Sequence, residues 1–160
     1  MSSQKSQLQR VIREYKIQTG ATEIDMHDVA RFAVTECGWR LPEPVDPYDR
    51  LARQLSKAAR DEMRQDTATG RPYRANHAVT ETRGGRQMTL WVDIDEAPRP
   101  RMVKSLIQRR EQMVGDAVQL TFDAEHWNSV HPDEEPITME LDFTEDVEWR
   151  KNSEASEKAS

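Results

Sequence analysis

The chain has 160 residues and a net charge of −6, with 32% charged and 36% apolar residues. This length predicts one domain with a modest core and room for a tail. A single cysteine, Cys37, excludes an internal disulfide and a cysteine-based zinc site. The polar start MSSQKSQLQR and the lack of a long apolar run predict a cytoplasmic protein without a membrane contact.

Two helices are predicted before residue 40. The spacing of one buried helical face predicts a helix over residues 4–18, with apolar positions at Leu8, Val11, Ile12 and Tyr15. The stretch TEIDMHDVARFAVTECG predicts a second helix over residues 25–37. Prolines then exclude a continuous helix in the loop that follows, at Pro42, Pro44 and Pro47.

A third helix is predicted over residues 47–65, because Asp46 followed by Pro47 is a good start signal. Leu51 and Leu55 lie on one side, which we expect to be buried. The opposite side carries a stripe of cations at Arg50, Arg53, Lys57, Arg60 and Arg64. This stripe is either an ordinary solvated helix face or a binding surface for an anionic partner.

After Gly70 the apolar period changes to two, which predicts a hairpin over residues 73–95. Gly84-Gly85 suits a two-residue turn with positive φ angles. The register that follows pairs Val79 with Leu90, His77 with Val92 and Ala75 with Ile94, on the face expected to lie against the helices. Arg83 and Arg86 flank the turn, so the hairpin tip is predicted to be cationic.

A long helix is predicted over residues 98–128. Its apolar positions recur every seven residues, at Leu106, Met113, Leu120 and Trp127. The pattern fits either packing on the helix's own domain or the seam of a homodimer, and Gly115 could mark a break.

The C-terminal segment is acidic. Residues 121–160 hold 12 Asp or Glu and 3 Lys or Arg, whereas the rest of the chain holds 17 and 20, a balance of +3. We therefore divide the chain into a domain over residues 1–131 and an acidic tail over 132–160. Within the tail, ITMELDF over residues 137–143 alternates as a short strand or as a segment that docks on a protein partner, and residues 150–160 are expected to be disordered.

Catalytic patterns are poor. His126 and His131 have acidic neighbours, but their spacing matches no established metal-ligand motif. His77 falls on the apolar face of the hairpin, where a structural role is expected. We therefore expect no enzyme activity, no cofactor and no bound metal.

The predicted order of three helices, a hairpin and a further helix resembles a winged helix-turn-helix domain over residues 4–95. The resemblance is carried by IDMHDVARFAV as the supporting helix, DRLARQLSKAARDEMRQ as the recognition helix and RGGR as the tip of the wing. It implies an α+β winged-helix-like fold with the third helix in the major groove of double-stranded DNA and the wing on phosphate or the minor groove. The proline-containing loop before the third helix departs from the usual tight turn.

By this resemblance, the candidate nucleic-acid-binding residues are the five stripe cations together with Arg83 and Arg86. A DNA-binding transcriptional regulator, dimeric through the 98–128 helix, is the expected function. The alternative is a protein–protein interaction module that acts through the winged-helix surface or the acidic tail without binding DNA. Stretches such as LWVDIDEAP are also similar to uncharacterised bacterial proteins, a similarity that implies no function.

Overall fold

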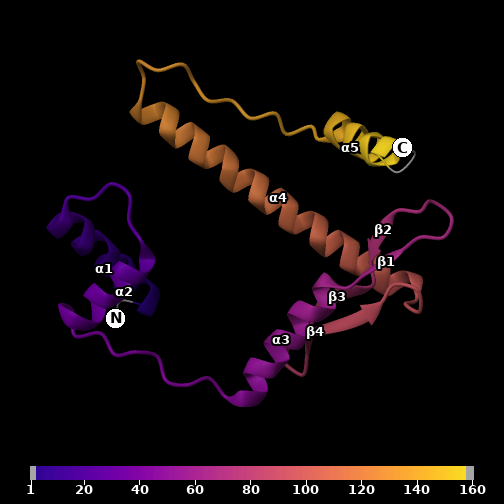
Figure 1. Ribbon diagram of the computed structural model, residues 1–160, viewed down its shortest axis with the longest axis horizontal. Coiled ribbons are helices and arrows are strands. Elements are labelled where there is room, and N and C mark those ends of the chain that lie inside the picture. Colours follow the sequence, from indigo (N-terminus) through magenta and orange to yellow (C-terminus); the bar gives the residue numbers. More distant parts are fainter. Residues whose placement is uncertain (1–2, 158–160) are drawn as a thin grey trace. The chain divides into compact units, whose positions relative to one another are not determined.

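The computed structural model describes residues 3–157, with side chains to residue 153, and consists of α-helices and two small antiparallel hairpins (Figure 1). By its internal contacts the chain divides into two compact units, residues 1–53 and 54–160. The sequence did not indicate this division, and the predicted domains over 1–131 and 132–160 stay a prediction.

The first unit contains two helices close to their predicted bounds, α1 (Gln4–Thr19) and α2 (Met26–Thr35). Gly20 ends α1 in the left-handed region at φ 68°, and the Asp25 side chain caps α2 by accepting from the His27 amide at 2.7 Å. The two helices share a small buried cluster of Val11, Val29 and Ala33, with partly buried apolar residues around it.

Helix α3 (Pro47–Asp61) begins as predicted, with the Asp46 carboxylate accepting from the Tyr48 amide at 2.7 Å. Two features of the prediction are wrong. The helix ends four residues before position 65, and its apolar side is not buried, since Leu51 is 50% and Leu55 60% exposed. Nearer the end of the helix Ala59 is half-buried, and its carbonyl accepts from the Asn76 side chain at 3.1 Å.

The residues predicted as the last turn of that helix form a strand instead. Strand β1 (Met63–Gln65) pairs antiparallel with β2 (Pro72–Arg74). The helix stops because the Glu62 carbonyl accepts from the distant Ala75 amide at 3.1 Å, which turns the chain away from the helix axis. Asp66 then closes the connecting turn with its carboxylate, which accepts from the Ala68 amide at 2.7 Å.

The main hairpin consists of β3 (Asn76–Arg83) and β4 (Arg86–Asp93), and its predicted register is confirmed. Val79 lies opposite Leu90 and His77 opposite Val92, while Ile94 donates its amide to the Ala75 carbonyl at 2.9 Å. The turn residues Gly84 and Gly85 both have positive φ, 55° and 75°, as the two-residue turn requires. The predicted inward face is buried at Ala75, just before β3, and at His77 and Val79 on β3.

Helix α4 (Arg99–Val130) continues through Gly115 without a break and packs on β3. Its side chains bond to the free edge of that strand. Ser105 donates its hydroxyl to the Ala78 carbonyl at 2.7 Å, and the Gln108 amide bonds to both the N–H and the C=O of Thr80, at 3.0 and 2.7 Å. Gln108 therefore takes the place of a neighbouring strand at this edge.

The predicted tail strand over residues 137–143 does not form. The segment lacks a neighbouring strand; instead, Asn128 of α4 bonds to both backbone groups of Ile137 at 2.8 Å. Leu141 and Phe143 line a groove on α4. A further helix that the sequence did not predict, α5 (Thr144–Glu157), occupies much of the segment expected to be disordered, and residues 158–160 lie outside the described residues.

The chain is therefore α+β. Among the helices of residues 3–157, none combines the length and apolar character needed to cross a bilayer.

Candidate functional site

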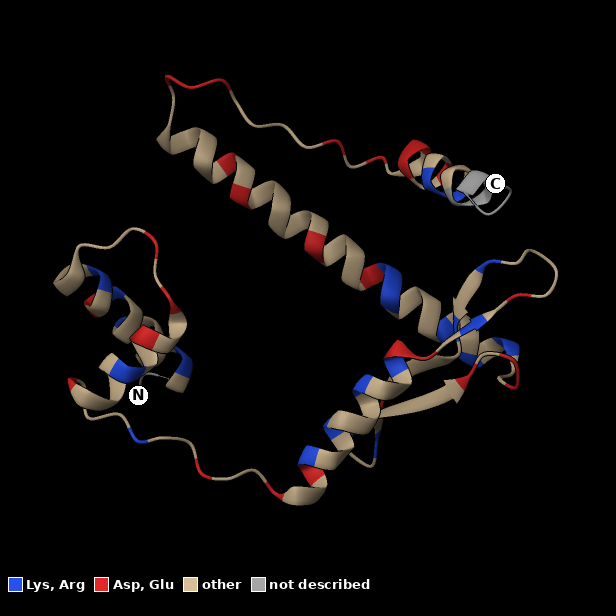
Figure 2. Ribbon diagram, viewed as in Figure 1, with Lys and Arg blue, Asp and Glu red and all other residues tan. Residues whose placement is uncertain are grey.

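The cationic stripe of α3 consists of Arg50, Arg53, Lys57 and Arg60. Their spacings of three, four and three residues keep them on one helix face, and all four are exposed. Within the described residues none of them has an ion-pair partner, so the face is free to bind an external anion. Figure 2 shows basic positions recurring along α3.

Arg64 does not belong to this stripe, which corrects the prediction. It lies on β1, where its guanidinium donates to both carboxylate oxygens of Asp93, at 2.8 and 2.6 Å, and to Asp95 at 2.8 Å. These hydrogen bonds raise the pKa of Arg64, and the Arg64 contact is the main reason that the pKa of Asp93 is lowered to about 2. Arg64 therefore ties β1 to the end of β4.

The two arginines at the hairpin tip differ in their surroundings. Arg83 is ion-paired with Glu81 at 2.6 Å. Glu81 also contacts Arg101 at 2.6 Å and Lys104 at 3.5 Å, and the hydrogen bond from Arg101 is the main cause that lowers its pKa to about 2. Arg86 has no ion-pair partner in the described part of the chain. Of the predicted wing cations, Arg86 is the one left for an external anion.

A second cationic feature was missed by the sequence reasoning. A cavity of 450 Å³ lies between the C-terminal part of α3, the main hairpin and α4. Three arginines from three elements line it: Arg60, Arg74 and Arg109. Arg74 ends β2 and Arg109 lies on α4, so no local spacing in the sequence could have brought them together with Arg60.

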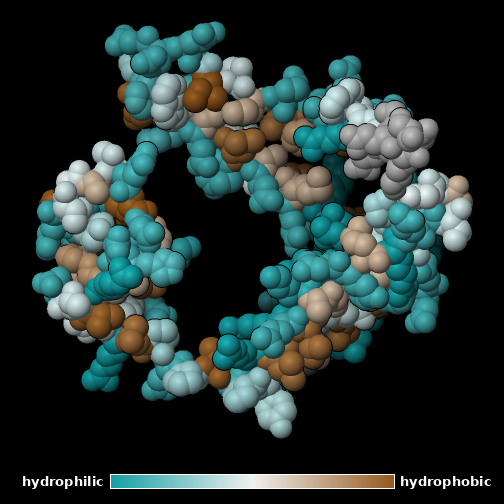
Figure 3. Space-filling view, in the orientation of Figure 1, coloured by the Kyte–Doolittle hydropathy of each residue, from teal (hydrophilic) through white to brown (hydrophobic). Residues whose placement is uncertain are grey.

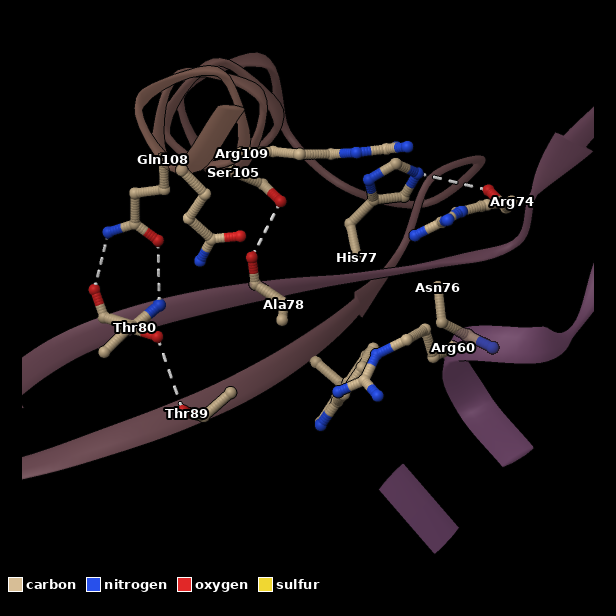
Figure 4. A pocket seen from close by; sticks show the side chains of 12 residues that line it. Arg60, Arg74, Asn76, His77, Ala78, Thr80, Thr89, Ser105, Gln108 and Arg109 are labelled. Atoms are coloured by element: carbon tan, nitrogen blue, oxygen red, sulfur yellow. Dashed lines mark hydrogen bonds between the residues drawn. The ribbon is translucent and has the colours of Figure 1, made fainter. Parts of the chain in front are cut away.

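His77 lies among these arginines and is 8% exposed. Its Nε2–H donates to the Arg74 carbonyl at 3.1 Å, and Nδ1 has no hydrogen-bond partner within the described residues. In Figure 4 the side chains of Arg74 and Arg109 reach toward the His77 ring, one from the end of β2 and the other from α4. The cavity lining therefore provides several hydrogen-bond donors and contains no carboxylate.

Apolar side chains are also exposed near the stripe. On α3 the exposed residues Leu51 and Leu55 lie on the side opposite the cations. Figure 3 shows hydrophobic surface over parts of α3 and α4. Helix α3 is therefore amphipathic, with both of its faces accessible in the described structure.

Metal-ligand groups do not gather in residues 3–157, where no cluster of three or more His, Cys, Asp or Glu side chains could hold an ion. His126 and His131 lie near the end of α4, and the His131 ring stacks on Trp127 with centroids 4.3 Å apart.

No protein-family model, curated protein or solved structure matches this chain. Functional evidence therefore comes from its own residues.

Proposed function

We propose that this protein is a cytoplasmic DNA-binding protein with a winged-helix-like domain, that it regulates transcription, and that α3 contacts the duplex. One observation carries the proposal: Arg50, Arg53, Lys57 and Arg60 form an exposed helical face without acidic partners in the described chain. A helix face of this kind is suited to a polyanion, because phosphates then replace water and counterions around charges that no carboxylate neutralises.

The geometry of α3 fits a DNA groove. A rise of about 1.5 Å per residue spreads the stripe from Arg50 to Arg60 over roughly 15 Å, and a major groove about 12 Å wide admits one helix. Three of the four cations are arginines, which bind phosphate or the edge of guanine with two parallel hydrogen bonds. Arg86 at the hairpin tip supplies a further cation for a phosphate outside the groove.

The experiment compares duplex binding by fluorescence anisotropy. The stripe variant is Arg50→Gln/Arg53→Gln/Lys57→Gln. The control variant, Arg13→Gln/Arg40→Gln/Arg71→Gln, removes the same charge from exposed arginines outside α3 that have no ion-pair partner in the described structure. Circular dichroism verifies that both fold.

We expect the stripe variant to bind a random-sequence duplex at least about a hundredfold more weakly than wild type at low salt, and the control to lose much less. Equal losses in the two variants would mean that only net charge matters. No binding by wild type at low salt would reject the proposal.

The alternative function is a protein–protein interaction module, and the exposure of Leu51 and Leu55 favours it. A partner that covers this face would be released by Leu51→Ser/Leu55→Ser and retained by the stripe variant. DNA binding should instead be lost in the stripe variant and retained in Leu51→Ser/Leu55→Ser. The same two variants therefore distinguish the two functions.

A further inference from the structure

The cavity between α3, the main hairpin and α4 has a chemistry that the stripe alone does not explain. Its three arginines, Arg60, Arg74 and Arg109, form no ion pair with the described residues. All three residues are exposed, so water solvates their like charges and leaves the guanidinium groups accessible. Three guanidinium groups from three elements therefore line one cavity whose lining holds no carboxylate.

Acidic side chains are available nearby but are engaged elsewhere. Glu81 binds Arg83, Arg101 and Lys104. Asp93 and Asp95 bind Arg64. These ion pairs engage Glu81, Asp93 and Asp95 and leave the cavity arginines without carboxylates. Among the lining residues, Asn76 is the one whose side chain bonds to a carboxylate of the described chain, that of Glu62 at 2.7 Å.

The cavity is built around fixed polar groups. Gln108 is held by two hydrogen bonds to Thr80, and Ser105 by one to Ala78 (Figure 4). These bonds fix the first turns of α4 against β3, and with them the position from which Arg109 enters the cavity. Trp91 adds an aromatic wall and Gln112 an amide without a bonding partner in the described residues.

From these observations we propose that the cavity binds a phosphate group, held by Arg60, Arg74 and Arg109. Guanidinium groups match phosphate oxygens in geometry, and a dianionic phosphate compensates most of the charge that converges there. At 450 Å³ the cavity exceeds a bare phosphate ion, so the rest of the ligand lies against Trp91. The phosphate belongs either to a free phosphate ester or to a nucleic-acid backbone.

This inference goes beyond the proposed DNA contact of α3. Arg74 and Arg109 lie outside α3, and a free phosphate ester would occupy the cavity whether or not the stripe binds DNA. Arg60 alone belongs to both features and is left unchanged in the test.

The test uses the full chain. Isothermal titration calorimetry measures the binding of adenosine 5′-monophosphate and of inorganic phosphate, with adenosine as the uncharged control. The pocket variant is Arg74→Gln/Arg109→Gln. Its matched control, Arg71→Gln/Arg99→Gln, removes two charges from exposed arginines that do not line the cavity. Thermal unfolding verifies that both variants fold.

If the phosphate in the cavity belongs to a free phosphate ester, wild type and the matched control should bind the monophosphate and not adenosine. The pocket variant binds it at least about a hundredfold more weakly, roughly tenfold for each lost guanidinium. If the source is a nucleic-acid backbone, the small probes do not bind, and duplex affinity falls in the pocket variant but not in the matched control.

The proposal is overturned if the pocket variant matches its control toward both the monophosphate and the duplex. The stripe variant separates this outcome from failure of the DNA proposal. If the stripe variant no longer binds the duplex but still binds the monophosphate, the stripe and the cavity are independent sites. If wild type binds the monophosphate but not the duplex, the DNA proposal fails and the phosphate site in the cavity is retained.

Discussion

At the scale of single residues, carboxylates decide which arginines are structural and which are available. Arg64 and Arg60 are four residues apart and both belonged to the predicted stripe. The structure gives Arg64 two acidic partners, Asp93 and Asp95, and gives Arg60 none within the described chain. A helical spacing of cations cannot reveal this difference, because the partners come from the far end of a hairpin.

Replacement of Arg64 should therefore affect stability rather than binding. Arg64→Gln loses the paired hydrogen bonds to Asp93 and leaves that carboxylate, which is 24% exposed, without its cation. We expect the melting temperature to fall by roughly 5 °C, and duplex affinity to change far less than in the stripe variant. Thermal unfolding of Arg64→Gln beside Arg50→Gln measures this. Equal melting temperatures for the two variants would contradict the structural role.

Glu81 predicts a specific acid sensitivity. Its pKa is lowered from 4.5 to about 2 in the folded chain, chiefly by Arg101. Since the unfolded chain binds the proton more readily, the contribution of Glu81 to stability is complete above pH 4.5 and is lost as the pH falls toward 2. Melting temperatures across this range should fall more steeply for wild type than for Glu81→Gln. Parallel curves would show that Glu81 is not stabilised as described.

At the scale of elements, the hairpin was predictable and the end of α3 was not. Strands β3 and β4 alternate over eight residues each, and Gly84-Gly85 fixes their register within the segment itself. Helix α3 ends where Glu62 bonds to Ala75, a contact that depends on the fold of the following hairpins. The three-residue strand β1 is too short to show a period of two.

At Thr80 the free edge of β3 depends on one side chain of α4, that of Gln108. Gln108→Leu removes both bonds to Thr80 and leaves its backbone groups unpaired, which should cost about 1–3 kcal/mol. Amide exchange at Thr80 should then become at least about tenfold faster. Gln112→Leu, one turn further along α4, is the matched control because it has no bond to the strand. Unchanged exchange at Thr80 in Gln108→Leu would mean that the edge is protected by something else.

At the scale of the whole molecule, exposed apolar surface is the main property that the sequence predicted incompletely. The seam on α4 was expected either to pack on its own domain or to form a dimer. Only its first turns pack on β3, and exposed fractions of 49% at Leu106, 56% at Met113 and 42% at Leu120 remain. The cavity arginines could not be predicted either, because three separate elements supply them.

Dimerisation through α4 stays a prediction that this exposure supports. Sedimentation equilibrium should give about twice the 18.6 kDa of one chain, and Leu106→Glu/Leu120→Glu should restore the monomer mass. Gln112→Glu/Gln119→Glu adds the same charge to exposed polar positions of the helix and should leave the dimer intact. A monomeric wild type at millimolar concentration would exclude this seam.

The central claim is that the cationic stripe of α3 contacts phosphates, and the salt dependence of duplex binding tests it most directly. The logarithm of the binding constant is measured against the logarithm of the salt concentration for wild type and the stripe variant. Because each phosphate contact contributes about 0.9 to the slope, loss of three cations should make the slope shallower by about 2.7. An unchanged slope would show that Arg50, Arg53 and Lys57 do not contact DNA, and would contradict the account.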